Sequence, residues 1–463
     1  MLDCEQDLSA PAQIRTRAVL CEHFRCPEWP VSSLPPRLYG NNGYSLSADA
    51  PKCSESSWQY KDDGARENLG DDYHTVIIEG LGSMLPRHWS EAVEDLRLER
   101  YMKDARPSEW SRSKRSLGDF YYRARPLISL PIRKHIQRAF FKHWQQISFP
   151  SWPVDVTADH ILEESLARSM KANGIERLPF VWFWPYGARA CVALTHDVES
   201  KRGHDYCSKL MDIDDSCGLK ASFQLVPEGR YRVSGELVRE MRTRGYEVNI
   251  QDFNHDGRLF FQKNEFLRRA RKMNEYGKSY GAKGFRSAVM YRNEDWYDAL
   301  EFAFDMSVPN VAHLDPQRGG CCTVMPYFIG QILELPLTTT QDYTLFHVLH
   351  SYSTKLWATQ IDMIKRHNGL ISLLIHPDYI IEKSAATMYR TLLSLLTKLR
   401  SAERLWYAVP GEVNEWWRAR SKMRVVYHDG AWRVEGKGAS RATVAFAKLA
   451  GERIEYEVVP SQP

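Results

Sequence analysis

Short apolar runs alternate with longer amphipathic stretches between residues 188 and 402. Apolar runs bounded by turn residues predict buried strands, and the amphipathic stretches between them predict helices. Seven strands are expected, at residues 190–195, 221–227, 246–250, 282–287, 304–310, 331–337 and 370–377. Repeated strand–helix units predict a parallel sheet that closes into a barrel or bends toward one.

The chain before this region divides into two parts. Residues 1–70 are rich in Pro, Ser, Gly, Asp and Asn and lack periodicity, which predicts loop or disorder. Residues 71–180 predict a mostly helical region. Its expected elements are a short strand or turn at 74–80, an amphipathic helix at 88–105, a second helical region at 116–147 and a helix within 149–174.

Boundary residues complete the division of the chain. For the helix within 149–174, Thr157 or Asp159 is expected as the N-cap and Gly174 lies beyond its end. Residues 181–418 are predicted to form the barrel. Residues 419–463 are predicted to form a small β-rich appendage, which begins with a β-hairpin whose turn contains Asp429 and Gly430.

Composition narrows the class of protein. The 463 residues suffice for two or three domains, and 62 basic against 58 acidic residues are too balanced for a nucleic-acid-binding surface. Nine cysteines without a Cys-x-x-Cys pair indicate a reducing compartment. Because neither a secretory signal nor an apolar run of about 20 residues is visible, we expect a cytoplasmic protein without a transmembrane segment. The oligomeric state stays open.

The stretch from Ala190 to Ser200 carries the first candidate chemistry. An apolar strand ends abruptly in Thr195, His196, Asp197, Val198 and Glu199. In an extended backbone, side chains at positions i and i+2 point to the same side, so the two acids are expected to converge. The carboxyl ends of strands are where α/β folds place their chemistry. A strand end with solvated charges is the alternative interpretation.

Polar groups also follow the strand at 246–250. Gln251 and His255 are four residues apart, and they would share a face if this loop were helical. A divalent ion needs ligands from separate strand ends, and Asp197, Glu199 and His255 offer them. The neighbouring Asp256 is a candidate to orient the imidazole ring of His255.

Three further residues lie at or beyond later strand ends. Arg286 ends one strand, and its permanent charge suits it to hold a carboxylate in place. Asp342 follows the strand at 331–337. His376 follows a strand in which five of six residues are apolar, a position suited to general acid–base catalysis, although a buried structural histidine would give the same pattern.

The motifs THDVE, NHDG, GFRS, LELP and LIHP, in this order, resemble those of the polysaccharide deacetylases, also known as carbohydrate esterase family four. The resemblance covers roughly residues 185–410. It implies a distorted (β/α)7 barrel, which agrees with the strands expected above. It also implies metal-dependent hydrolysis of an N-acetyl group on an amino sugar, with an N-acetylated sugar or glycan as the ligand.

The resemblance assigns a role to each catalytic candidate. Asp197 matches the catalytic base, and Arg286 matches the arginine that positions this base. His376 matches the histidine that protonates the leaving amine, and Asp342 corresponds to the acid that supports His376.

The resemblance also implies a metal site. Glu199 and His255 match metal ligands, and Gln251 stands where the family has the first histidine of its His-x-x-x-His motif. The implied cofactor is a divalent metal, with zinc expected first and cobalt or manganese as alternatives. An amide oxygen binds zinc less well than an imidazole does.

Three functions therefore remain open at this stage. The first is an active, metal-dependent deacetylase acting on an amino sugar of a polysaccharide or its precursor. The second is a catalytically inactive relative that binds glycan, which the glutamine at position 251 favours. The third is an amidohydrolase with the same fold that acts on a C–N bond outside a sugar.

Overall fold

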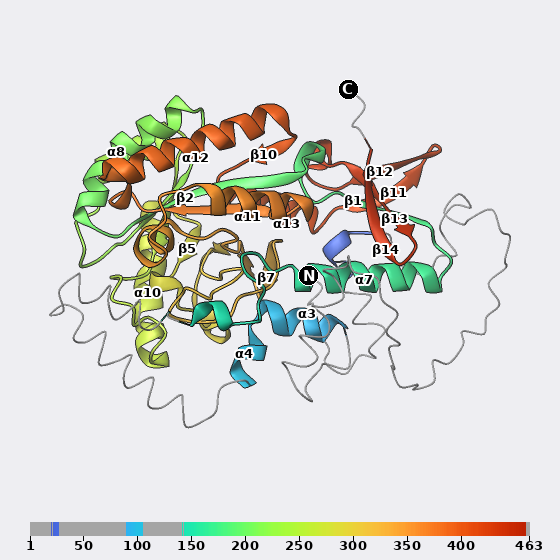
Figure 1. Ribbon diagram of the computed structural model, residues 1–463, viewed down its shortest axis with the longest axis horizontal. Coiled ribbons are helices and arrows are strands. Elements are labelled where there is room, and N and C mark those ends of the chain that lie inside the picture. Colours follow the sequence, from blue (N-terminus) through green and yellow to red (C-terminus); the bar gives the residue numbers. More distant parts are fainter. Residues whose placement is uncertain (1–19, 21, 27–88, 105–140, 142, 460–463) are drawn as a thin grey trace.

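The computed structural model of the chain describes residues 20, 22–26, 89–104, 141 and 143–459 (Figure 1). The loop expected over nearly all of residues 1–70, the strand or turn at 74–80 and most of the helical region at 116–147 lie outside these residues. Among the described residues, no helix is both long enough and apolar enough to cross a bilayer.

A curved, mostly parallel sheet of nine strands forms the centre of the fold. Its strand order is β10-β2-β3-β4-β5-β6-β8-β7, and β9 pairs with β2. All pairings are parallel except that between β7 and β8. The strands are β2 (Ala190–Val198), β3 (Ser222–Leu225), β4 (Glu247–Gln251), β5 (Gly284–Arg286), β6 (Phe304–Asp305), β7 (Tyr327–Ile329), β8 (Ile332–Glu334), β9 (Leu370–Ile375) and β10 (Leu405–Tyr407).

This sheet confirms the predicted distorted (β/α)7 barrel, since each of the seven expected strands is present. Five of them are shorter than expected, most of all β6, which pairs with β8 at Phe304 and Asp305 and again through a single bridge between Pro309 and Leu337. The segment after β8 closes the barrel against β9 through side chains instead. The Thr338 hydroxyl donates to Leu370 O at 2.6 Å and accepts from Ser372 N at 2.9 Å. The antiparallel strand β7 was not predicted.

Helices follow the strands and pack on the outside of the sheet, with α8 and α12 on one side of the view and α10 below them (Figure 1). Their apolar faces form a core with the outward-facing residues of β2, β3, β4 and β9. The helices are α8 (Lys201–Ser216), α9 (Gly235–Thr243), α10 (Lys263–Tyr280), α11 (Lys355–Arg366), α12 (Lys383–Ala402) and α13 (Pro410–Arg420).

A second, three-stranded sheet contains β1 (Arg177–Val181), β13 (Val444–Ala450) and β14 (Arg453–Val458). The predicted C-terminal strands are thus present, and β1, which precedes the barrel in the chain, pairs with β13. The β1 strand crosses the boundary predicted at residue 180. The hairpin of β11 (Arg424–His428) and β12 (Ala431–Glu435) turns at Asp429 and Gly430, both with positive φ as expected.

The N-terminal helices differ from the prediction at two points. The helix expected at 88–105 is broken into α3 (Trp89–Arg97) and α4 (Arg100–Asp104), with Glu99 between them at a φ of 49°. The next helix, α7 (Thr157–Ala172), does not use Thr157 or Asp159 as its N-cap. Thr157 N donates to Asp155 Oδ1 at 2.8 Å, whereas Asp159 binds Thr323 and Val324 inside the protein.

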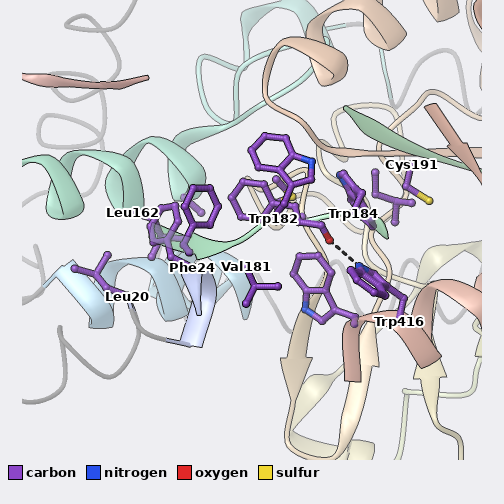
Figure 2. Close-up of a cluster of buried hydrophobic side chains, with 14 of the residues drawn as sticks. Leu20, Phe24, Leu162, Val181, Trp182, Trp184, Cys191 and Trp416 are labelled. Carbon is purple, nitrogen blue, oxygen red and sulfur yellow. Dashed lines mark hydrogen bonds between the residues drawn. The ribbon is translucent and has the colours of Figure 1, made fainter. Parts of the chain in front are cut away.

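One hydrophobic core joins the two sheets and the N-terminal residues (Figure 2). Phe24 from the N-terminal segment and Leu162 of α7 lie at one end of this cluster, and Trp184, Cys191 and Trp416 lie at the other (Figure 2). The indole of Trp416 donates to Phe183 O at 2.7 Å. The barrel, the second sheet and α7 therefore contribute residues to one shared buried core.

Candidate active site

The carboxyl ends of the parallel strands bring the predicted site residues to one mouth of the barrel. Asp197 is the last but one residue of β2, and Gln251 and Arg286 are the last residues of β4 and β5. His376 directly follows β9. Because parallel strands all end at the same edge of their sheet, their terminal side chains are close in space although far apart in the chain.

Asp197 is buried and is held from two sides. Arg286 Nη1 donates to Asp197 Oδ1 at 2.8 Å and to the Thr195 hydroxyl at 2.9 Å. Gln251 Nε2 donates to the other carboxylate oxygen, Oδ2, at 3.0 Å. The guanidinium is completely buried and is further fixed by the bond from its Nε to Met306 O at 3.0 Å. A permanent positive charge therefore lies directly beside the Asp197 carboxylate.

Glu199 is at the centre of the site. Its Oε1 atom lies 3.2 Å from Gln251 Nε2, 2.8 Å from His255 Nε2 and 3.3 Å from His376 Nε2. Burial alone would raise the pKa of Glu199, but the positive charge of the two imidazoles outweighs it and holds the pKa well below its usual value. Asp197 and Glu199 share the Gln251 amide, so the two acids do point to the same side.

His376 is positioned by Asp342. Its Nδ1 lies 2.6 Å from Asp342 Oδ1, and its backbone N donates to Asp342 Oδ2 at 2.7 Å. Burial would lower the pKa of His376, yet the carboxylates of Asp342 and Glu199 outweigh it and hold the pKa well above 6.5. The Tyr379 ring covers the imidazole at a centroid distance of 4.7 Å. The Nε2 atom of His376 is thus directed at Glu199.

We expected Gln251 and His255 to share a face if the loop after β4 were helical. This loop is not helical. Asp252 and His255 both adopt positive φ, and this turn brings His255 Nε2 to Glu199. Asp256 does not orient the ring, since it pairs with Arg269 at 2.8 Å. Arg230 takes that place, with Nη2 at 3.4 Å from His255 Nδ1 and donating to His255 O at 2.5 Å.

The donor atoms around Glu199 suit a divalent cation. His255 Nε2 approaches Glu199 without the alignment of a hydrogen bond, and the buried Gln251 Oε1 has no hydrogen-bond partner. The amide O and N are exchanged by a half-turn of the side chain, which would direct this oxygen at the two acids. The ligand atoms of Asp197, Glu199 and His376 also lie within 4.8 Å of one another. Oxygen and imidazole donors of this kind bind zinc and similar ions.

All seven site residues named from the sequence lie in this one network, which extends from Arg286 through Asp197, Gln251 and Glu199 to the histidines and Asp342. Sequence reasoning missed Thr195, Arg230 and Tyr379. Thr195 had a usable signal, because it lies two residues before Asp197 and therefore on the same face of β2. Nothing in the sequence pattern indicated the other two.

The fold and the site define the class of this protein. It is a parallel (β/α) barrel that carries acids and imidazoles at its mouth. No protein-family model and no curated protein matches the sequence. Among solved structures, similarity is found to a protein from Mycobacterium smegmatis described as a polysaccharide deacetylase, with 15% identity, a TM-score of 0.41 and coverage of 54% of this chain and 96% of that chain.

Two further solved structures are similar over about half of this chain. The allantoinase PuuE has 11% identity and a TM-score of 0.40, with coverage of 51% of this chain and 92% of that chain. The peptidoglycan deacetylase PdaC from Bacillus subtilis has 13% identity and a TM-score of 0.30, with coverage of 49% and 90%. These similarities are to polysaccharide deacetylases and an allantoinase, and they concern the fold alone. At such TM-scores, any conclusion about activity rests on the geometry of the site.

Proposed function

We propose that this protein is a hydrolase that removes an N-acetyl group from an amino sugar of a polysaccharide or its precursor, with the help of a divalent cation. One observation carries the proposal. A carboxylate fixed by a buried arginine, Asp197, and an imidazole fixed by a buried carboxylate, His376, lie on two sides of Glu199 at the barrel mouth. This is the arrangement of a base and an acid that act on one bond.

Asp197 is the base in the proposed reaction. The Arg286 guanidinium fixes one of its carboxylate oxygens, and the bond from Gln251 Nε2 fixes the second. In this position Asp197 accepts the proton of a water molecule as that water attacks the acetyl carbonyl carbon. General-base catalysis of this kind contributes about 10²–10⁴ in rate.

His376 is the acid. Asp342 accepts a hydrogen bond from Nδ1, so the proton available for transfer is on Nε2, which faces the site. When the C–N bond breaks, this proton goes to the departing amine nitrogen. The raised pKa of His376, caused by the carboxylates of Asp342 and Glu199, keeps the imidazole protonated near neutral pH.

Glu199, His255 and Gln251 would hold the cation, with zinc as the first candidate and cobalt or manganese as alternatives. When bound, such an ion polarises the acetyl carbonyl and lowers the pKa of water at the site. The orphaned Gln251 oxygen and the unaligned His255 nitrogen support this assignment. The substrate class is taken from the resemblance of the motifs, since the same base and acid also suit the hydrolysis of other amides.

One observation favours the second candidate, a catalytically inactive glycan-binding relative. The Gln251 amide donates to both Asp197 and Glu199, so its NH₂ group bridges the two acids in the way that a cation would. A protein with this arrangement has no requirement for a metal. The two candidates differ in metal content and in turnover.

The test combines both measurements. The protein is purified after growth with zinc, cobalt or manganese, and its metal content is compared with acetate release from N-acetylated chitooligosaccharides by the wild type and by Asp197→Asn. We expect close to one equivalent of metal and acetate release that the substitution abolishes. A metal content below about a tenth of an equivalent, together with no acetate release, would contradict the hydrolase and favour the glycan-binding candidate. If the protein hydrolyses only amides outside sugars, the proposed substrate class is wrong, and the protein is an amidohydrolase of the third kind considered above.

A further inference from the structure

The chain turn that follows Arg286, residues 287–292, has a backbone that needs external support. Val289 and Met290 are consecutive residues at φ of 61° and 55°. A left-handed conformation is rare for any residue with a side chain, and for a β-branched residue such as valine it is an outlier. Strained positions of this kind are unfavourable in free energy and persist only where surrounding contacts hold them. We call residues 287–292 the β5 loop.

Arg292 holds the β5 loop from within the protein. Its Nη1 donates to Met290 O at 2.8 Å, so the guanidinium fixes the strained turn directly. The backbone N of Arg292 donates to Gln317 Oε1 at 3.0 Å, and Gln317 Nε2 returns a bond to Arg292 O at 3.2 Å. The Arg292 side chain is completely buried, so its charge requires a partner.

That partner is Glu99, which lies 193 residues earlier in the chain. Arg292 Nε donates to Glu99 Oε2 at 2.5 Å, and Nη2 donates to Oε1. Glu99 Oε1 also accepts from the backbone N of Gly320 at 2.5 Å. Glu99 itself adopts a φ of 49° in the break between α3 and α4. The break in the predicted helix therefore delivers a carboxylate to the β5 loop.

Gly319 and Gly320 lie against the Glu99 carboxylate and leave the space that it needs. A Cβ atom on Gly319 would collide with Glu99 Oε1, and one on Gly320 would collide with the backbone of Asn310. Tyr101 from α4 donates to Gly320 O at 2.8 Å and ties the same segment to the N-terminal helices. In Figure 1, α3 and α4 lie below the barrel, on the side of β7. Glu99, Arg292 and the two glycines thus form one buried unit.

We propose that Glu99 is a positioning residue for the active site. It acts through Arg292, which keeps the β5 loop in its strained form next to Arg286 at the barrel mouth. The described part of the N-terminal region, α3 and α4, then has a function beyond packing: it completes one wall of the substrate site. The effect of Glu99 on catalysis rests on the proposed function. The support that Glu99 gives to the β5 loop does not depend on any activity.

A purely structural ion pair makes different predictions from a positioning one. Loss of folded protein lowers the rate for every substrate by the same factor, because it lowers the concentration of active enzyme. A displaced β5 loop instead changes the ratio of kcat/KM between substrates that reach the loop and substrates that do not. N-acetylated chitotetraose is long enough to extend over the mouth, and p-nitrophenyl acetate reaches only the central groups.

The experiment uses the full chain with Glu99→Gln, which keeps the shape of the side chain and removes its charge. Glu403→Gln is the matched control, because Glu403 accepts a 2.5 Å bond from Lys365 in an ion pair that does not involve the β5 loop. Hydrogen exchange of the Tyr291 and Arg292 amides is followed by mass spectrometry. We expect exchange at least tenfold faster in Glu99→Gln, confined to residues 287–292 and 317–320, and no change in Glu403→Gln.

The kinetic arm compares the two substrates. We expect the kcat/KM ratio of chitotetraose to p-nitrophenyl acetate to fall at least fivefold in Glu99→Gln and to stay constant in Glu403→Gln. Unchanged local exchange, or an equal loss for both substrates, would overturn the proposal. Arg292→Lys, which keeps the charge but not the fork of donors, serves if Glu99→Gln does not fold. If the wild type hydrolyses neither substrate, the proposed function fails, and the exchange result alone decides whether Glu99 supports the loop.

Discussion

Replacement of Asp342 by asparagine tests the assignment of His376 as the acid. Asp342 accepts two N–H groups from the same residue, the ring Nδ1 at 2.6 Å and the backbone N at 2.7 Å. Oδ1 also accepts from the backbone N of Tyr343 at 2.8 Å. Asparagine has only one acceptor oxygen, so in either orientation its NH₂ group faces a backbone N–H that has lost its acceptor. In both orientations the imidazole also loses the negative charge beside Nδ1, so His376 is expected to hold its second proton less firmly.

The size of the effect follows from the bonds that change. A hydrogen bond to a charged group contributes about 1.5–3 kcal/mol, and each 1.36 kcal/mol corresponds to about tenfold in rate. We therefore expect Asp342→Asn to lower kcat by about 10–150-fold. We also expect the alkaline limb of the pH profile to move to lower pH, because the Asp342 carboxylate is the largest of the interactions that raise the pKa of His376.

The assay is acetate release from N-acetylated chitooligosaccharides as a function of pH, with Asp214→Asn as the control. Asp214 is also a buried acid beside a histidine, with Oδ2 at 3.1 Å from His196 Nε2, and this pair does not belong to the network around Glu199. The control is expected to lose stability and to keep the pH profile of the wild type. If kcat in folded Asp342→Asn stays within twofold of the wild type, His376 is not the acid.

Four further predictions concern the same site. Gln251→His should bind zinc at least about tenfold more tightly in isothermal titration calorimetry, and an unchanged affinity would mean that residue 251 does not face the ion. Arg230→Ala should also strengthen zinc binding in the same titration, because the Arg230 guanidinium lies 3.4 Å from His255 Nδ1 and its positive charge repels a cation held by the same ring. Asp197→Asn should lower kcat by about 10²–10⁴ while the protein stays folded by circular dichroism; a smaller loss would assign the base elsewhere. In protein treated with a chelator, Glu199 has a folded-state pKa below its unfolded value, so its contribution to stability is present above pH about 4.5 and is lost as the pH falls through the folded pKa. The difference in Tm between wild type and Glu199→Gln should therefore shrink on acidification, and a constant difference would contradict the ion pairs with His255 and His376.

The barrel and its mouth could be predicted because each strand leaves a local record in the sequence. Apolar runs end in Asp197, Gln251, Arg286 and His376. Each of these ends indicates where a strand stops and which side chain lies there. Parallel pairing then brings these ends together without further information. The loop after β4 was harder, since its course depends on positive φ at Asp252 and His255, two residue types that adopt it without a glycine to announce it.

Contacts between distant segments left no such record. The pairing of β1 with β13 joins residues that are more than 260 positions apart, for example Val181 with Val444. The same is true of Glu99 and Arg292: an acid in an amphipathic helix is normally a solvated residue, and only the folded chain shows that this one is buried. Periodicity describes which face of an element is apolar, but not which partner covers it.

The pairing of β1 with β13 also determines when the protein can finish folding. A ribosome completes residues 177–198 long before it reaches Val444, so the edge of β1 that β13 covers in the folded protein stays unpaired until then. A nascent chain stopped short of residue 444 would expose this edge to other chains.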